Sequence, residues 1–127
     1  MDISTLIPSE RLIEIKHPVT EQNIGIRVNI ISLNDDKMKQ IRRRFINKRL
    51  ELEKRGKSFK ADDIESNEID LLVACIVGWD WYSDDVKFGD FKPEFNEMNV
   101  RKVLNTLPWF KEQISEAVGD DKAFFQS

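Results

Sequence analysis

The segment 24–30 constrains the fold of this chain most strongly, because it alternates strictly between apolar side chains and other residues. The aliphatic members that share one face are Ile24, Ile26, Val28 and Ile30. Such an alternation predicts a β-strand with one buried face. A single strand cannot satisfy its backbone or cover its apolar face, so it needs a pairing partner and a layer of helices.

A shorter alternation just upstream supplies the pairing partner. Ile13 and Ile15 share one face, and Leu12, Glu14 and Lys16 share the other. The stretch between the two alternations, HPVTEQN, carries turn residues, and its X-Pro step favours an extended backbone. We therefore expect an antiparallel β-hairpin over residues 10–33 with one buried face.

Helical spacing then predicts two helices in the middle of the chain. One apolar stripe, made of Met38, Ile41, Phe45 and Leu52, predicts a long amphipathic helix from Asp36 to about Arg55. Ser32, Asn34 and Asp35 are available to cap it, and Gly56 ends it. Asp62 and Glu65 resemble a capping box for a second helix, whose apolar face runs as far as Cys75, Ile76 and Trp79.

Two further helices are expected after a loop over residues 80–95. Asn96 caps the third helix, and Pro108 starts the fourth, which Gly119 ends. The predicted fold class is therefore α+β, an N-terminal antiparallel hairpin packed on a body of about four helices. Residues 1–127 make one domain, with the helical body at 35–119 and a tail at 120–127.

Composition sets the broad class of the protein. The chain has 127 residues, 40% of them hydrophobic and 34% charged, which suits one core with a highly charged surface. No run approaches the roughly 18 apolar residues that a membrane helix needs, and the N-terminus does not resemble a signal peptide. The single cysteine excludes an internal disulfide framework and fits a reducing cytoplasm.

Charge is strongly segregated along the chain. Residues 37–60 carry eleven basic and two acidic side chains, a net charge of +9, whereas residues 61–127 carry six basic and fifteen acidic ones, a net charge of −9. Blocks of opposite sign attract one another within one chain or between copies of it. A homo-oligomer is therefore one expectation.

Few side chains here suit catalysis or metal binding. The one histidine, His17, lies in a predicted turn, and Cys75 lies on an apolar helix face. One Cys and one His cannot make a zinc site, and the acidic pairs fall at helix starts or in loops, where capping explains them. The aspartates of residues 80–90 do not match the calcium-binding spacing of an EF-hand. We expect no enzymatic activity, no metal and no cofactor.

The basic residues of the first predicted helix have two interpretations. They are Arg42, Arg43, Arg44, Lys48 and Arg49. On a helical wheel they surround the apolar stripe, as on a solvated or self-associating helix, whereas a DNA-reading helix presents one face to the groove. The acidic pI of about 5.3 also opposes general nucleic-acid affinity. Nucleic-acid binding through residues 42–55 remains the weaker alternative.

Large aromatic residues gather between residues 79 and 110. Trp79 continues a predicted apolar helix face and Trp109 opens a helix, so both suit the core. Trp81, Tyr82 and Phe91 fit neither helical nor strand periodicity, and they either form an exposed apolar patch for a partner or fold back onto the core. The candidate partner-binding residues are Trp81, Tyr82, Phe91, Trp109 and Phe110.

Four runs of residues, in this order, resemble a family of tail assembly chaperones from long-tailed bacteriophages. They are HPVTEQNIGIRVNIIS, RRRFINKRLELEKRGK, LLVACIVGWDWYS and FNEMNVRKVLNTLPWFKEQISEAVGDDKAFF. The likeness covers nearly the whole chain and consists of structural signatures. It departs from the family after Gly78-Trp79, where the usual loop is short and acidic and this one is rich in aromatic residues.

The resemblance implies a role in binding. Such chaperones bind the long, largely helical tape measure protein in the host bacterial cytoplasm, keep it soluble and help recruit tail tube subunits. They are absent from the mature virion. Apolar grooves rimmed by charge suit that task. A structural tail or neck protein of the virion is the main alternative, although this sequence lacks the long β-rich body that would favour it.

Overall fold

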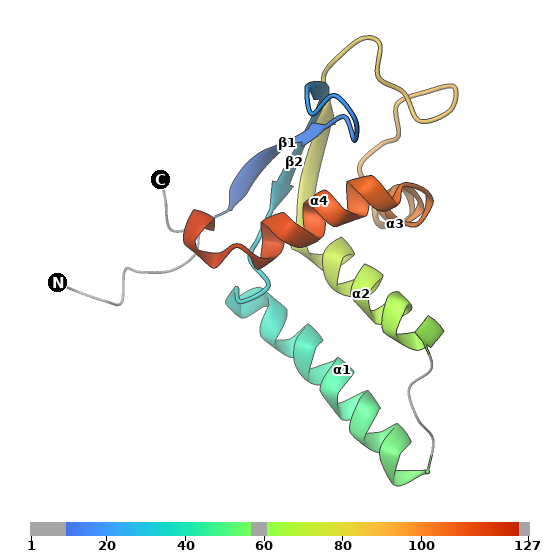
Figure 1. Ribbon diagram of the computed structural model, residues 1–127. Helices are drawn as coiled ribbons and strands as arrows, with labels where there is room; N and C mark the ends of the chain where they lie inside the picture. The colour runs from blue at the N-terminus through green and yellow to red at the C-terminus, as the bar shows by residue number, and fades with distance from the viewer. Residues whose placement is uncertain (1–9, 57–60, 125–127) are drawn as a thin grey trace, which may run out of the picture.

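The computed structural model describes residues 10–56 and 61–124, without the side chains of residues 61–66 and 121. Within these residues the chain forms one three-stranded antiparallel sheet and four α-helices, which confirms the predicted α+β class (Figure 1). The elements in order are β1 (Arg11–Lys16), β2 (Asn23–Ile30), α1 (Asp36–Lys54), α2 (Ala61–Cys75), β3 (Ile76–Trp81), α3 (Glu97–Thr106) and α4 (Pro108–Gly119). In this described part, no helix has the length and apolar character needed to cross a bilayer.

The predicted hairpin is present as β1 and β2. The strands pair antiparallel, with Ile13 opposite Val28, so both side chains lie on the same face of the sheet. The turn between them is held by His17, whose backbone N–H donates to the Gln22 carbonyl at 2.8 Å. The His17 Nδ1 atom accepts from the backbone N–H of Val19 at 3.1 Å. The one histidine of the chain therefore stabilises a turn.

Strand β3 is the main departure from the sequence prediction. The second helix does not continue to Trp79, because α2 ends at Cys75 and β3 starts at the next residue. β3 pairs antiparallel with β2, which places Trp79 opposite Val28. Pairing on this side gives β2 a second neighbour and satisfies an edge that the hairpin alone would leave open. The predicted capping box at Asp62 and Glu65 lies outside the described side chains.

An irregularity in the pairing keeps the apolar side chains of β3 on one face. Gly78 pairs with Asn29, but the next pair joins Ile76 to Ile30, so Val77 is an extra residue in β3. Without that extra residue, strict alternation would turn Ile76 to the open face of the sheet. The bulge instead leaves Val77 exposed and Ile76 buried in the core.

Gly25 allows β2 to start close to the end of β3. Its φ is +95°, and a Cβ atom at this position would lie 2.2 Å from the Cβ of Ser83. The Gly25 carbonyl accepts from the Tyr82 N–H at 2.9 Å. A residue with a side chain would therefore meet both backbone strain and a steric clash here.

Helices α3 and α4 cover the apolar face of the sheet, and α4 crosses the strands (Figure 1). Asn96 caps α3 as predicted, since its side chain accepts from the Asn99 N–H at 2.8 Å. Pro108 starts α4, also as predicted. The fully buried members of the core include Ile15, Val28, Ile30, Val103, Phe110, Ile114 and Val118. Phe124, from a short 3-10 helix in the predicted tail, is buried as well.

Helix α1 starts at the body of the molecule and then projects away from it (Figure 1). The Asp35 side chain caps it by accepting from the Lys37 N–H at 2.9 Å. Gly56, with a φ of +71°, follows its end, as the sequence predicts. Within the described residues, Met38 is the only fully buried side chain of α1. The other side chains of α1 are therefore mostly exposed to solvent.

Candidate partner-binding surfaces

Two of the five aromatic residues proposed as partner contacts are buried. Trp81 is 7% exposed and Phe110 is 0% exposed. Trp81 pairs with Ile26 across the sheet, which places its ring on the core face, where it meets the Trp79 ring edge-on at 5.5 Å between centroids. Phe110 lies on the core-facing side of α4 with Ile114. Burial therefore contradicts the assignment of Trp81 and Phe110 as candidate partner contacts, and for Trp81 the structure shows the other expected alternative, in which the ring folds back onto the core.

The loop after β3 folds back against the edge of that strand. The Lys92 ammonium donates to the Trp81 carbonyl at 2.9 Å, and the Trp79 indole N–H donates to the Pro93 carbonyl at 3.2 Å. The Phe95 ring packs edge-on against Trp79 at 5.9 Å. These contacts cover part of the Trp79 side chain, which is therefore half-buried. They also fix the position at which the loop enters α3.

Phe91 is the most exposed of the proposed aromatic contacts. It lies in a tight turn that starts at Phe88, whose N–H donates to the Phe91 carbonyl at 3.1 Å. Gly89 provides the positive φ of +75° that this turn requires. The Phe91 side chain is 71% exposed, so it is available on the surface.

Tyr82 lies on the open face of the sheet in a polar cluster. Its hydroxyl donates to a Glu14 carboxylate oxygen at 2.8 Å, and the other oxygen accepts from the Arg27 Nε–H at 2.8 Å. The Arg27 guanidinium stacks over the Tyr82 ring at 4.3 Å. The hydrogen bond from Arg27 lowers the pKa of Glu14, and the hydrogen bond to Glu14 raises the pKa of Tyr82. This cluster links β1 and β2 to the residue that directly follows β3.

Trp109 lines a hollow between β1 and α4, which we call the β1–α4 groove. It measures about 810 Å³. Its apolar lining is Ile13, Pro18, Trp109 and Ala117, and its charged lining is Arg11, Glu14, Lys16, Glu21, Glu112, Glu116 and Asp120. Five carboxylates against two cations make the groove acidic. Three of those carboxylates follow one another at four-residue spacing and are exposed: Glu112 and Glu116 on α4, and Asp120 at its C-cap.

Gln113 joins α4 to β1 at the end of this groove. Its side-chain amide donates to the Lys16 carbonyl at 2.8 Å, and its side-chain oxygen accepts from the Lys16 N–H at 2.8 Å. Two hydrogen bonds from one side chain to one residue fix the distance between helix and strand. The groove is therefore held open at a defined width.

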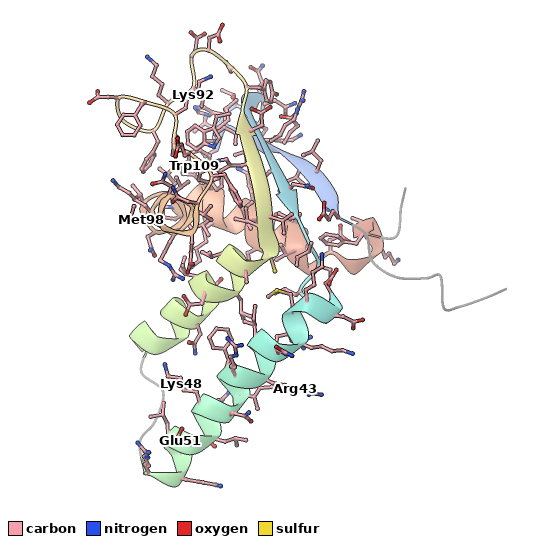
Figure 2. All side chains as sticks on the ribbon, turned by 180° about the vertical axis from the view of Figure 1, so that it is seen from behind. Arg43, Lys48, Glu51, Lys92, Met98 and Trp109 are labelled. Carbon is pink, nitrogen blue, oxygen red and sulfur yellow. The ribbon has the colours of Figure 1, made fainter. Side chains whose placement is uncertain are left out.

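A second hollow of about 530 Å³ lies where α1, α2, β3 and α3 meet, and we call it the α2–α3 groove. Its apolar lining is Ile41, Val73, Ala74, Ile76, Phe95 and Val100. Met98 on α3 is 74% exposed and lines an adjacent open hollow that shares Glu97 and Arg101 with this groove, and Figure 2 shows the Met98 side chain at the outer side of the helix. Apolar lining and an adjacent exposed methionine are typical of surfaces that bind an amphipathic helix.

Charged residues form one rim of the α2–α3 groove. Arg101 makes ion pairs with Asp70 on α2 and, at 3.2 Å, with Glu97 on its own helix. Asp70 and Glu97 favour the charged form of Arg101 and raise its pKa. The rim therefore presents a fixed cation between two carboxylates next to apolar side chains, and it fixes the position of α3 relative to α2.

The basic side chains of α1 do not form a single face. Figure 2 shows Arg43 and Lys48 leaving opposite sides of the helix. Arg42 donates to the Asn34 side chain at 3.1 Å, and Arg49 pairs with Glu53 at 3.5 Å. Arg43, Arg44 and Lys48 form no ion pair with the side chains that the structure describes. A cationic surface that surrounds the helix suits general electrostatic attraction better than base readout.

The described side chains offer few groups for chemistry. Cys75 is buried, and burial raises the pKa of its thiol to about 12, so it is protonated at neutral pH. Among the described residues, no group of three or more His, Cys, Asp or Glu side chains is placed to hold a metal ion.

No family model, no curated protein and no solved structure matches this chain. The interpretation of its surfaces therefore depends on their own geometry and charge.

Sequence reasoning missed the α2–α3 groove because its lining comes from four elements and includes a strand that was predicted as helix. One local signal was available. Met98 falls outside the apolar stripe of α3, which is formed by Val100, Val103 and Leu104. A large apolar residue that lies outside the buried stripe of its helix indicates a surface that can bind a partner.

Proposed function

We propose that this protein is a tail assembly chaperone of a long-tailed bacteriophage, which binds the tape measure protein in the host cytoplasm. The α2–α3 groove carries this proposal, since it combines an apolar lining, a charged rim and exposed apolar neighbours. The sequence resemblance supports the same role. In this role the chaperone keeps its client soluble, helps recruit tail tube subunits and leaves before the virion matures.

The groove suits one face of an amphipathic helix. A client helix would place apolar side chains, spaced at i, i+3, i+4 and i+7, against the partly buried Ile41, Val73 and Ala74. Phe95 and Met98 would then cover the outer side of the client helix, and Met98 in particular can adapt to different sequences. The rim holds one cation, Arg101, between the two carboxylates of Asp70 and Glu97, so its net negative charge suits basic side chains along the polar edge of that helix.

The direct test is co-expression with the tape measure protein encoded in the same phage genome. Pulldown and light scattering then measure whether the client stays soluble in a complex of defined composition. We expect the double variant Phe95→Ser, Met98→Glu to reduce the recovered client by about tenfold, because it removes exposed apolar contact area. Leu12→Ser is the matched control, since Leu12 is 61% exposed on the open face of the sheet.

Three results would overturn the proposal. The first is a tape measure protein that stays insoluble with or without this chain. The second is recovery of this chain in finished virions, which would favour a structural tail or neck protein. The third is equal client recovery by the groove variant and the Leu12→Ser control, which would exclude the α2–α3 groove as the site.

A further inference from the structure

Helix α1 carries a second apolar strip that faces solvent. Ile46 is 57% exposed and Leu50 is 51% exposed. With Lys39 and Arg43 they follow a spacing of four, three and four residues, which puts all four side chains on one side of the helix. We call these four residues the α1 strip. It lies apart from the stripe that includes Met38 and Ile41, which faces the body of the molecule.

The β1–α4 groove complements the α1 strip in both charge and polarity. The strip joins two cations to two aliphatic side chains, and Arg42 and Arg49 lie next to it. The groove joins an acidic row, Glu112, Glu116 and Asp120, to an apolar floor of Ile13, Trp109 and Ala117. Complementary potentials of this kind speed association and select the orientation of the partner.

One chain cannot bring these two surfaces together. The 19 residues of α1 make a rod of about 28 Å. Both views show its C-terminal half projecting away from β1 and α4 (Figures 1 and 2). Ile46 and Leu50, the aliphatic part of the strip, lie on this half and are therefore out of reach of the groove in their own chain, and a second copy presents the matching surface.

We propose that copies of this chain associate head to tail, with the α1 strip of one copy bound in the β1–α4 groove of the next. The contact is heterologous, because it joins two different surfaces, so it leaves one strip and one groove free in every dimer. Such contacts propagate into longer chains of subunits or close into a ring. This inference uses neither the α2–α3 groove nor a client protein. Its test is therefore independent of the test of the proposed function.

The test uses two variants that each disable one surface. Arg43→Glu with Leu50→Ser removes the α1 strip, and Glu112→Lys with Glu116→Lys removes the acidic row. All four side chains are exposed, so circular dichroism should show an unchanged fold. In sedimentation velocity at low salt, we expect the unmodified chain to form species larger than dimers as concentration rises. We expect each variant alone to remain monomeric.

Mixing the two variants gives the decisive result. Each retains the surface that the other lacks, so an equimolar mixture should form a one-to-one dimer and nothing larger. Raising the salt to about 0.5 M should weaken every association by about tenfold, because the paired charges are exposed. A single chain that carries Arg43→Glu and Glu116→Lys together should recover part of the self-association.

Any of four outcomes would overturn this inference. The unmodified chain could stay monomeric at all concentrations, or the mixture of variants could fail to form a dimer. Loss of assembly in the α1 variant with full assembly in the groove variant would indicate a symmetric contact between α1 helices. An α1 variant that loses retention on DNA but keeps its self-association would assign the strip to nucleic acid instead.

Discussion

Helices α1 and α4 differ sharply in how much apolar surface the fold buries. α4 buries Phe110, Ile114 and Val118, which lie one turn apart on a single face. α1 is longer, yet among the described residues it buries Met38 alone and leaves Ile46 and Leu50 exposed. Burial is the main source of stability in a small domain. The sheet with α3 and α4 therefore stabilises the fold, while α1 presents surface to the surroundings.

The outer half of α1 depends on weak local interactions. Arg49 pairs with Glu53, and Arg55 pairs with Glu51 at 2.8 Å, each four residues apart and more than half exposed. Exposed pairs at this spacing contribute about 0.3–0.5 kcal/mol each. A helical segment of about ten residues, such as this outer half, is marginal in water without tertiary contacts. The comparison therefore predicts unequal responses to mutation in the two regions.

The largest expected effect is Phe110→Ala. Phe110 is fully buried, so truncation should lower the free energy of unfolding by about 3–5 kcal/mol. Leu50→Ala in α1 should change it by about 0.5 kcal/mol or less. Urea denaturation followed by circular dichroism measures both values. Similar losses from the two variants would contradict the difference between α4 and α1.

The next effect is expected at Gly25 in the sheet. Gly25→Ala places a Cβ in a left-handed backbone conformation and 2.2 Å from the Cβ of Ser83. It should destabilise the protein by about 1–3 kcal/mol. Gly119→Ala is the matched control, because a Cβ there meets no heavy atom within 4 Å. The same denaturation measurement applies, and a tolerated Gly25→Ala would show that β2 and β3 can separate at this end without cost.

Removal of each helix cap should change the rate of amide hydrogen exchange in a different part of the molecule. Asn96 caps α3 and Asp35 caps α1, and loss of such a cap costs about 1 kcal/mol. We expect Asn96→Ala to accelerate exchange throughout the core, because α3 unfolds with the body. Asp35→Ala should accelerate exchange mainly within α1, which opens locally. Uniform acceleration by both variants would indicate that α1 unfolds together with the core.

The smallest expected effect is a pH dependence that arises on the open face of the sheet. The hydrogen bond from Arg27 lowers the pKa of Glu14 below its ordinary value of 4.5. The stability that the ionised Glu14 carboxylate contributes is therefore fully present above pH 4.5. It is lost as the pH falls through the lower pKa that Glu14 has in the folded state. The stability difference between the unmodified chain and Glu14→Gln should shrink below about pH 4.5. A difference that stays constant from neutral pH to pH 3 would exclude this linkage.

Local signals predicted much of this fold. The alternation around Val28 predicts β2, and the caps at Asp35 and Asn96 depend only on neighbouring backbone N–H groups. β3 was missed because Cys75 and Trp79 are four residues apart and so continue a helical apolar face. Pairing with β2, a contact some fifty residues away in sequence, decides that this segment is a strand.

The candidate surfaces were harder to predict for the same reason. Whether Trp81 is exposed depends on its register opposite Ile26, and the position of Ile76 depends on one extra residue at Val77. No local pattern encodes either feature. By contrast, the segregation of basic and acidic residues is visible in the sequence, and it is this property that underlies the proposed contact between copies.

The pair of hydrogen bonds between Gln113 and Lys16 has a consequence for how copies of this chain can meet. An outermost β-strand exposes backbone donors and acceptors, which recruit strands from other molecules and lead to aggregation. At Lys16 both groups are already occupied by a side-chain amide, which has the same donor and acceptor as a peptide bond. The glutamine thus imitates a neighbouring strand for one residue and protects this end of β1 from uncontrolled sheet extension, even in a crowded cell.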